Sequence, residues 1–140
     1  FPVTEYFTNM AAYTFDDTLA GTWSGSIYTN NMTVYITNVI QANGSINRKQ
    51  YIADDGLAAV GAPWSCFLQE EANGTVAHNA DKSFLLMTET WCRTITNMYP
   101  AATPAYRSGT VFKRMRIPME ISGSDMVVET PIGIITLTKN

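Results

Sequence analysis

The chain has 140 residues, the size of one domain. Of these, 46% are apolar and 15% charged, whereas disordered chains have few apolar and many charged residues. Nine lysines and arginines and a net charge of −3 exclude the strongly basic face of a typical nucleic-acid-binding protein. No apolar run approaches the roughly 20 residues that a membrane helix needs, so we expect a folded domain without a membrane span.

The first 18 residues form an apolar arm that precedes the regular pattern. Its candidate contact residues are Phe1, Val3, Tyr6 and Phe7. Large apolar side chains left in water forgo roughly 1.5–3 kcal/mol each. We therefore expect the arm to dock on its own domain or on another subunit.

Residues 19–140 are predicted to form an all-β domain. Threonine is the commonest residue, at 18 positions, and it favours a pleated, half-buried surface. Turn dipeptides such as Asn43-Gly44 and Asn73-Gly74 recur at short intervals, which is typical of a sandwich or barrel. The predicted strands are 22–28, 32–40, 45–52, 67–70, 84–95, 110–117, 126–130 and 134–138. About eight strands indicate a single antiparallel barrel or sandwich.

Three N-glycosylation acceptors indicate export. Asn31, Asn43 and Asn73 each begin an Asn-X-Ser/Thr triplet without proline in the middle. The chain also opens at Phe1 with no signal-peptide pattern, as expected if a leader has been removed. We therefore expect a secreted, extracellular protein that carries N-linked glycans.

The chain has two cysteines, Cys66 and Cys92. In an oxidising compartment a lone pair is read as one disulfide, whereas in the cytosol two buried thiols would be common. The sequons favour the disulfide.

Little in the sequence supports catalysis or metal binding. His78 is the single histidine and is expected in a loop, with no nucleophile pattern around any serine. One histidine and two oxidised cysteines would not make a zinc site. We therefore expect a non-enzymatic protein with no cofactor and no metal.

Aromatic residues supply the best material for a ligand site. Trp23, Tyr35, Trp64 and Trp91 are the candidates, because apolar ligand cavities are lined by aromatic side chains with few polar groups. Ordinary core packing uses the same residues.

Both ends of the β region resemble lipocalins and related calycin barrels. Residues 19–25, Leu-Ala-Gly-Thr-Trp-Ser-Gly, look like the Gly-X-Trp opening of the first barrel strand, and residues 119–139 are similar to a closing hairpin. In that family the tryptophan closes one end of the barrel beneath a basic side chain from the last strand. The resemblance assigns these roles to Trp23 and Lys139, although the usual basic residue is arginine and the family's Thr-Asp-Tyr motif is absent.

Two functions follow. The first is a lipocalin-like barrel that binds a small apolar ligand. The second is a structural subunit of an extracellular glycosylated fibre or coat, in which the arm adds a strand to a neighbouring copy.

Overall fold

The computed structural model describes residues 3–4, 13–29, 32–54, 66–96 and 105–140. This part of the chain is all-β, with one short 3-10 helix, Asp17–Leu19, and no α-helix. The strands are β1 (Val3–Thr4), β2 (Gly21–Thr29), β3 (Met32–Ile40), β4 (Ser45–Asp54), β5 (Cys66–His78), β6 (Phe84–Thr96), β7 (Ala105–Ser122), β8 (Asp125–Thr130) and β9 (Gly133–Lys139).

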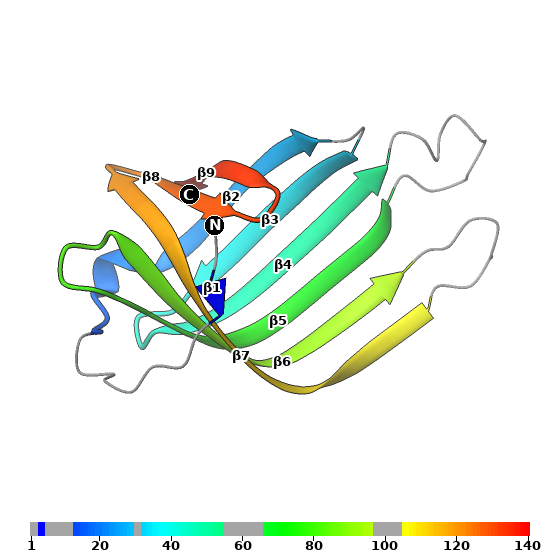
Figure 1. Ribbon diagram of the computed structural model, residues 1–140, viewed down its shortest axis with the longest axis horizontal. Coiled ribbons are helices and arrows are strands. Elements are labelled where there is room, and N and C mark those ends of the chain that lie inside the picture. The colour runs from blue at the N-terminus through cyan, green and yellow to red at the C-terminus, as the bar shows by residue number, and fades with distance from the viewer. Residues whose placement is uncertain (1–2, 5–12, 30–31, 55–65, 97–104) are drawn as a thin grey trace.

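Strands β2 to β9 form a closed eight-strand antiparallel barrel. Each strand pairs with the next along the chain, and β9 returns to pair with β2 (Figure 1). Closure removes most of the free sheet edge, but the outer side of β7 over residues 105–113 has no strand partner among the described strands. The predicted all-β class is confirmed, and the alternative of a sandwich is wrong.

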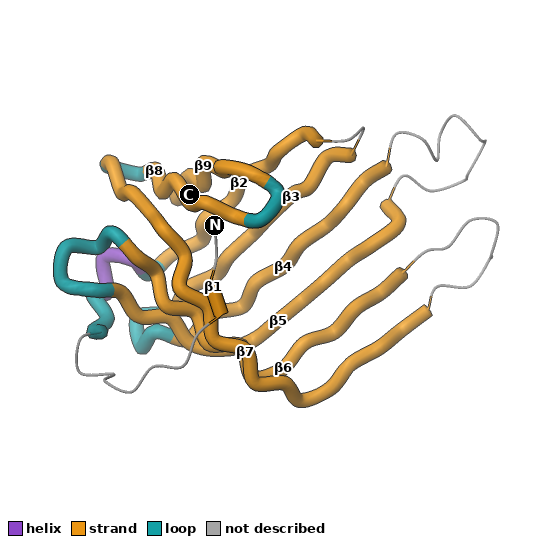
Figure 2. Tube along the Cα trace, viewed as in Figure 1, coloured by secondary structure: helices purple, strands orange, loops and turns teal. Residues whose placement is uncertain are grey.

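The two ends of the barrel differ. The 3-10 helix lies at the same end as the turns after β3 and β5 (Figure 2). At the opposite end β4 to β7 extend well past the short β8–β9 hairpin (Figure 1). We call these the closed end and the open end.

Trp23 seals the closed end. Its side chain is 1% exposed, and its Nε1 donates a hydrogen bond to the Leu19 carbonyl oxygen at 2.8 Å. The Lys139 ammonium lies 5.3 Å from the centre of the indole ring and donates to the Thr18 carbonyl at 2.7 Å. The expected pairing of Trp23 with a basic residue of the last strand is confirmed.

The core follows the alternation of the strands. Val34, Ile36 and Ile40 on β3 are buried, while Tyr35 between them is 50% exposed, as the period of two requires. Full burial of such an aliphatic side chain contributes about 1.5–3 kcal/mol. The buried core also includes Leu19, Ile46, Val76, Leu85, Met87, Ile117, Met119, Met126, Val128, Ile135 and Leu137.

Asn73-Gly74 lies inside β5 and not in the predicted turn. The register between β5 and β6 shifts between Asn73 and Gly74, which marks a bulge. A Cβ on Gly74 would lie 1.8 Å from the Thr88 carbonyl oxygen. Glycine serves here to let two backbones approach closely, so β5 continues for 13 residues to His78.

Strand β7 is also longer than predicted and changes partner along its length. It pairs with β6 from Ala105 to Pro118 and with β8 from Met119 onward. The Met119 amide donates to the Ser83 carbonyl beside β6, so the nitrogen of Pro118 faces the other side. Because proline has no N–H, no ladder hydrogen bond to β6 is lost at this position. At this residue β7 changes its partner strand from β6 to β8.

The described part of the N-terminal segment lies on its own barrel. Strand β1 pairs with β7 through Val3 and Arg116, Thr14 forms a bridge with His78, and Phe15 packs against the core. Phe1, Tyr6 and Phe7 lie outside the described residues. His78, expected in a loop, ends β5 and is 3% exposed.

The predicted disulfide is wrong. Cys92 lies opposite Ala72 in the β5–β6 ladder, and Cys66 begins β5 six residues before Ala72. Six residues of strand span roughly 20 Å, whereas a disulfide joins Cα atoms about 4.4–6.8 Å apart. Cys92 is a free cysteine.

Candidate functional site

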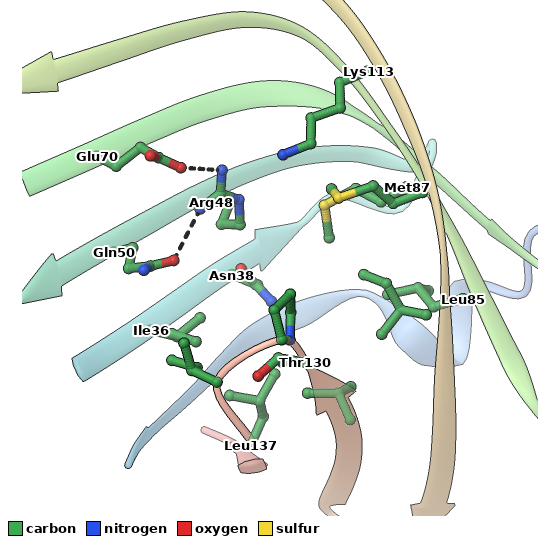
Figure 3. Close-up of a pocket in the computed structure, with 15 residues that line it drawn as sticks. Ile36, Asn38, Arg48, Gln50, Glu70, Leu85, Met87, Lys113, Thr130 and Leu137 are labelled. Atoms are coloured by element: carbon green, nitrogen blue, oxygen red, sulfur yellow. Dashed lines mark hydrogen bonds and ion pairs between the residues drawn. The ribbon is translucent and has the colours of Figure 1, made fainter. Parts of the chain in front are cut away.

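A cavity of about 250 Å³ lies inside the barrel between its core and the open end (Figure 3). Its apolar wall comes from inward-facing positions on five strands, and the turn between β8 and β9 forms part of its rim. The apolar lining residues are Ile36, Leu85, Met87, Met115, Ile117, Val128, Pro131, Ile132 and Leu137. This part of the wall can bury the body of a small molecule but offers it no hydrogen bond.

One side of the cavity is polar and is organised by Arg48 of β4. Its Nε donates to Glu89 at 2.7 Å, its Nη2 donates to Glu70 at 2.6 Å, and its Nη1 donates to Gln50 at 3.3 Å. Figure 3 shows Glu70 and Gln50 on either side of the guanidinium. The Arg48 side chain is 14% exposed and that of Glu89 is 4% exposed. The cluster is therefore an ion triad in which Arg48 and Glu89 are nearly buried while Glu70, 35% exposed, reaches solvent.

Two opposing effects act on the charge of Arg48. Burial lowers its pKa, but the ion pairs with Glu89 and Glu70 outweigh burial and raise it above the usual value. Arg48 is thus held as a cation whose hydrogen-bonding groups are directed at the protein's own carboxylates.

Asn38 of β3 lines the cavity next to this triad. It faces Arg48 across the β3–β4 ladder, and it is 7% exposed. Its Oδ1 is buried and accepts no hydrogen bond from the described residues. Buried acceptors are normally satisfied, so this oxygen is an exception in the wall beside the cavity.

Lys113 and the β8–β9 turn border the cavity. Lys113 faces Glu89 across the β6–β7 ladder and extends toward the Arg48 side of the cavity (Figure 3). In the turn, the Thr130 hydroxyl donates to the Gly133 carbonyl at 2.7 Å, which holds the neighbouring rim residues in place.

The predicted aromatic residues lie elsewhere in the barrel. Trp23 is buried at the closed end. Tyr35 is half exposed on the outer face, where its ring meets that of Tyr51 edge-on at 6.1 Å. Trp91 is half buried on β6 and Trp64 lies outside the described residues. None of the three described residues lines the cavity.

Two of the three sequon asparagines are described, and both are exposed. Asn43 lies in the turn before β4, where its Oδ1 accepts from the Ser45 amide at 3.0 Å. Asn73 lies on the outer face at the β5 bulge and accepts from Asn47 Nδ2 at 2.8 Å. Asn31 lies outside the described residues.

His78 does not contribute to the cavity. Its Nδ1 donates to the Asn79 carbonyl at 2.7 Å, and its buried Nε2 has no partner among the described residues. Among the residues that the structure describes, no three histidine, cysteine or acidic side chains lie close enough together to form a metal site.

The ion triad beside the cavity was not predicted from the sequence, although a signal for it was present. Arg48 alternates with the core residue Ile46 on β4, and Glu89 follows Leu85 and Met87 on β6 at the same period of two. A charge at an inward position of a strand indicates a buried ion pair. Aromatic content was the weaker indicator.

Comparisons with known proteins give no relative. No family model matches the chain, and no curated protein and no solved structure matches it significantly. Within the described residues, no helix has the length and apolar character to cross a membrane. The fold therefore defines the class, an eight-strand antiparallel barrel with an internal cavity that is compatible with a lipocalin-like fold.

Proposed function

We propose that this protein binds a small, largely apolar molecule inside its barrel and acts by binding, without catalysis. The observation that carries the proposal is the cavity of about 250 Å³, apolar on most of its wall and polar along one side. Small-molecule sites have this composition, with burial supplying affinity and a few polar groups fixing orientation. Since Trp23 seals the closed end, we propose that the ligand enters from the direction of the open end.

The size of the cavity limits the ligand. A cavity of about 150 Å³ lined by apolar side chains holds benzene. A cavity of about 250 Å³ therefore suits one aromatic ring with a short alkyl chain, or an aliphatic molecule of similar bulk.

The proposal can be tested by blocking the cavity. Val128 lines it, while Val127 beside it on β8 points to the outer face. We expect titration with para-propyltoluene, followed by calorimetry, to show binding that Val128→Phe weakens at least tenfold and Val127→Phe leaves unchanged. Melting curves without ligand check that both variants fold. Equal binding by the wild type and Val128→Phe would contradict the proposal.

We also propose that the protein is secreted and glycosylated. The support is the set of sequons, of which Asn43 and Asn73 are exposed. The absence of the Cys66–Cys92 disulfide removes one argument for an oxidising compartment. Treatment of natively purified protein with an amidase that removes N-linked glycans should lower its mass, and an unchanged mass would refute glycosylation.

Assembly by strand addition is the second candidate function. Among the described strands, the outer edge of β7 over residues 105–113 has no strand partner, and β1 pairs with β7 just beyond it. Tyr106 and Phe112 on this stretch are 66% and 72% exposed. An exposed edge with apolar side chains accepts an added strand. The N-terminal arm of a second copy would pair with β7 in the register that β1 uses within its own chain.

Size-exclusion chromatography with light scattering tests assembly. The full chain should form concentration-dependent oligomers, and a chain that lacks residues 1–4 should remain monomeric with an unchanged cavity. A monomer at all concentrations for the full chain would reject this candidate.

A further inference from the structure

We propose that the cavity takes an amphipathic anion, a molecule with an apolar body and a carboxylate head, and that Lys113 is the counter-ion of this head. The inference rests on the proposed function and names the chemical class of its ligand. Two observations support it. The charged and apolar residues of the cavity wall lie at different levels, and Lys113 has no partner among the described residues.

The cavity wall is charged toward the open end and apolar toward the closed end. Inward-facing pairs across the β6–β7 ladder show this order. From the open end toward the closed end they are Glu89–Lys113, Met87–Met115 and Leu85–Ile117. A ligand that follows this wall places its apolar body against the two methionines, where burial supplies affinity. Its polar head then lies at the level of Lys113.

Lys113 is a cation that a ligand can reach. It lines the cavity, and Figure 3 shows its side chain extending into this space beside Arg48. Its ammonium makes no ion pair or hydrogen bond with any residue that the structure describes. Because the side chain is exposed, a head bound there keeps contact with water. The high cost of burying a charge away from solvent is therefore avoided.

The two carboxylates nearby are held by Arg48. Glu89 faces Lys113 across the ladder, but its carboxylate accepts from Arg48 Nε at 2.7 Å and its side chain is 4% exposed. Glu70 accepts from Arg48 Nη2 at 2.6 Å, and at 35% exposure its charge is partly screened by solvent. A ligand anion at Lys113 thus meets an ammonium without a partner, whereas a ligand cation at Glu70 would compete with Arg48.

The experiment compares three para-propyl benzenes with different heads: the anionic para-propylbenzoate, the neutral para-propylbenzamide of similar shape, and the cationic para-propylbenzylammonium. Para-propyltoluene is measured in parallel as a test of the cavity itself. Calorimetry at pH 7 and low salt follows binding to wild type, Lys113→Met and Lys49→Met. Methionine keeps a long apolar stem. Lys49→Met is the matched control, because Lys49 is exposed on β4 and does not line the cavity.

We expect Lys113→Met to weaken the benzoate about five- to tenfold, the worth of one charge-assisted contact at a partly solvated site. The benzamide and the toluene should bind this variant as they bind wild type, and Lys49→Met should change none of the probes. Added salt should weaken the benzoate more in wild type than in Lys113→Met. Wild type should prefer the benzoate to the benzylammonium by about tenfold or more.

Other outcomes overturn the inference in distinguishable ways. If Lys113→Met weakens the benzoate and the benzamide equally, the lysine stem only shapes the wall. If Lys49→Met weakens the benzoate as much as Lys113→Met does, the anion responds only to the net charge of the protein. Tighter binding of the benzylammonium than of the benzoate would assign a cationic ligand class. In all three cases the proposed function stands, whereas both fail if none of the four probes binds.

Discussion

Replacing Arg48 with methionine removes the cation of the ion triad while keeping a long apolar stem against the cavity wall. Two carboxylates then lose their counter-ion. The more serious loss is at Glu89, whose side chain is 4% exposed and lies 2.7 Å from the guanidinium. Glu70, 35% exposed, can turn toward water.

The magnitude follows from distance and burial. With an effective dielectric of about 20, charges 2.7 Å apart attract by about 6 kcal/mol. In the intact pair, the free-energy cost of removing the two charges from water offsets much of this attraction. In the variant, the cost of burying the Glu89 charge remains while the attraction is lost. Removing one partner of a buried pair costs about 3–5 kcal/mol, a large part of the roughly 5–15 kcal/mol that holds a domain folded.

A second arginine supplies the control. Arg93 pairs with Glu71 at the same distance of 2.7 Å, but their side chains are 44% and 19% exposed. Exposed pairs contribute about 0.2–1 kcal/mol, so Arg93→Met should change the free energy of unfolding by less than about 1 kcal/mol. Urea unfolding of both variants measures the contrast directly.

A third variant separates the buried charge from lost packing. Adding Glu89→Gln to Arg48→Met removes the uncompensated charge, so the double variant should recover a large part of the lost stability. Equal losses in Arg48→Met and Arg93→Met, or no recovery in the double variant, would show that burial does not set the contribution of this triad to stability.

Three smaller predictions test other parts of the fold. The Lys82 ammonium, and then the Thr18 amide, hold the pKa of Asp16 well below its usual range. The contact therefore stabilises the fold above pH 4 and is lost at lower pH, so Asp16→Asn should lower the melting temperature at pH 7 and have a shrinking effect below pH 4. Gly74→Ala places a Cβ against a carbonyl oxygen of β6 and should lower the free energy of unfolding by about 2–3 kcal/mol. At Gly109 an added Cβ meets nothing within 4 Å, so Gly109→Ala should be nearly neutral. Similar urea midpoints for the two variants would contradict this. Alkylation without reductant should label Cys92, and a thiol that reacts only after reduction would show that it is bridged.

The sequence predicted the class and the closed end of this barrel because both depend on local patterns. Alternation on β3 and the Gly-Thr-Trp triplet are read directly from neighbouring residues, and Trp23 and Lys139 meet as the resemblance implied. Strand boundaries were predicted less well. Gly74 was read as part of a turn, although glycine also permits a bulge within a strand, and only the position of the partner strand distinguishes the two.

The cavity could not be predicted because its residues come from strands far apart in the chain. Asn38 and Arg48 are ten positions apart in sequence, but Glu89 joins them only when β6 takes its place in the barrel. The disulfide prediction failed for a similar reason. Pairing two cysteines requires the register of β5 and β6, which offsets them by six residues.

We propose that small molecules enter the barrel and leave its closed end undisturbed. Methyl-labelled methionines report on this by NMR, because Met87 and Met115 line the cavity, whereas Met126 is 1% exposed and is not among the lining residues. On titration with para-propyltoluene, we expect saturable shifts of the Met87 and Met115 methyl signals and a smaller shift of the Met126 signal. Unchanged signals from Met87 and Met115 at saturating probe, or equal shifts at all three, would contradict it.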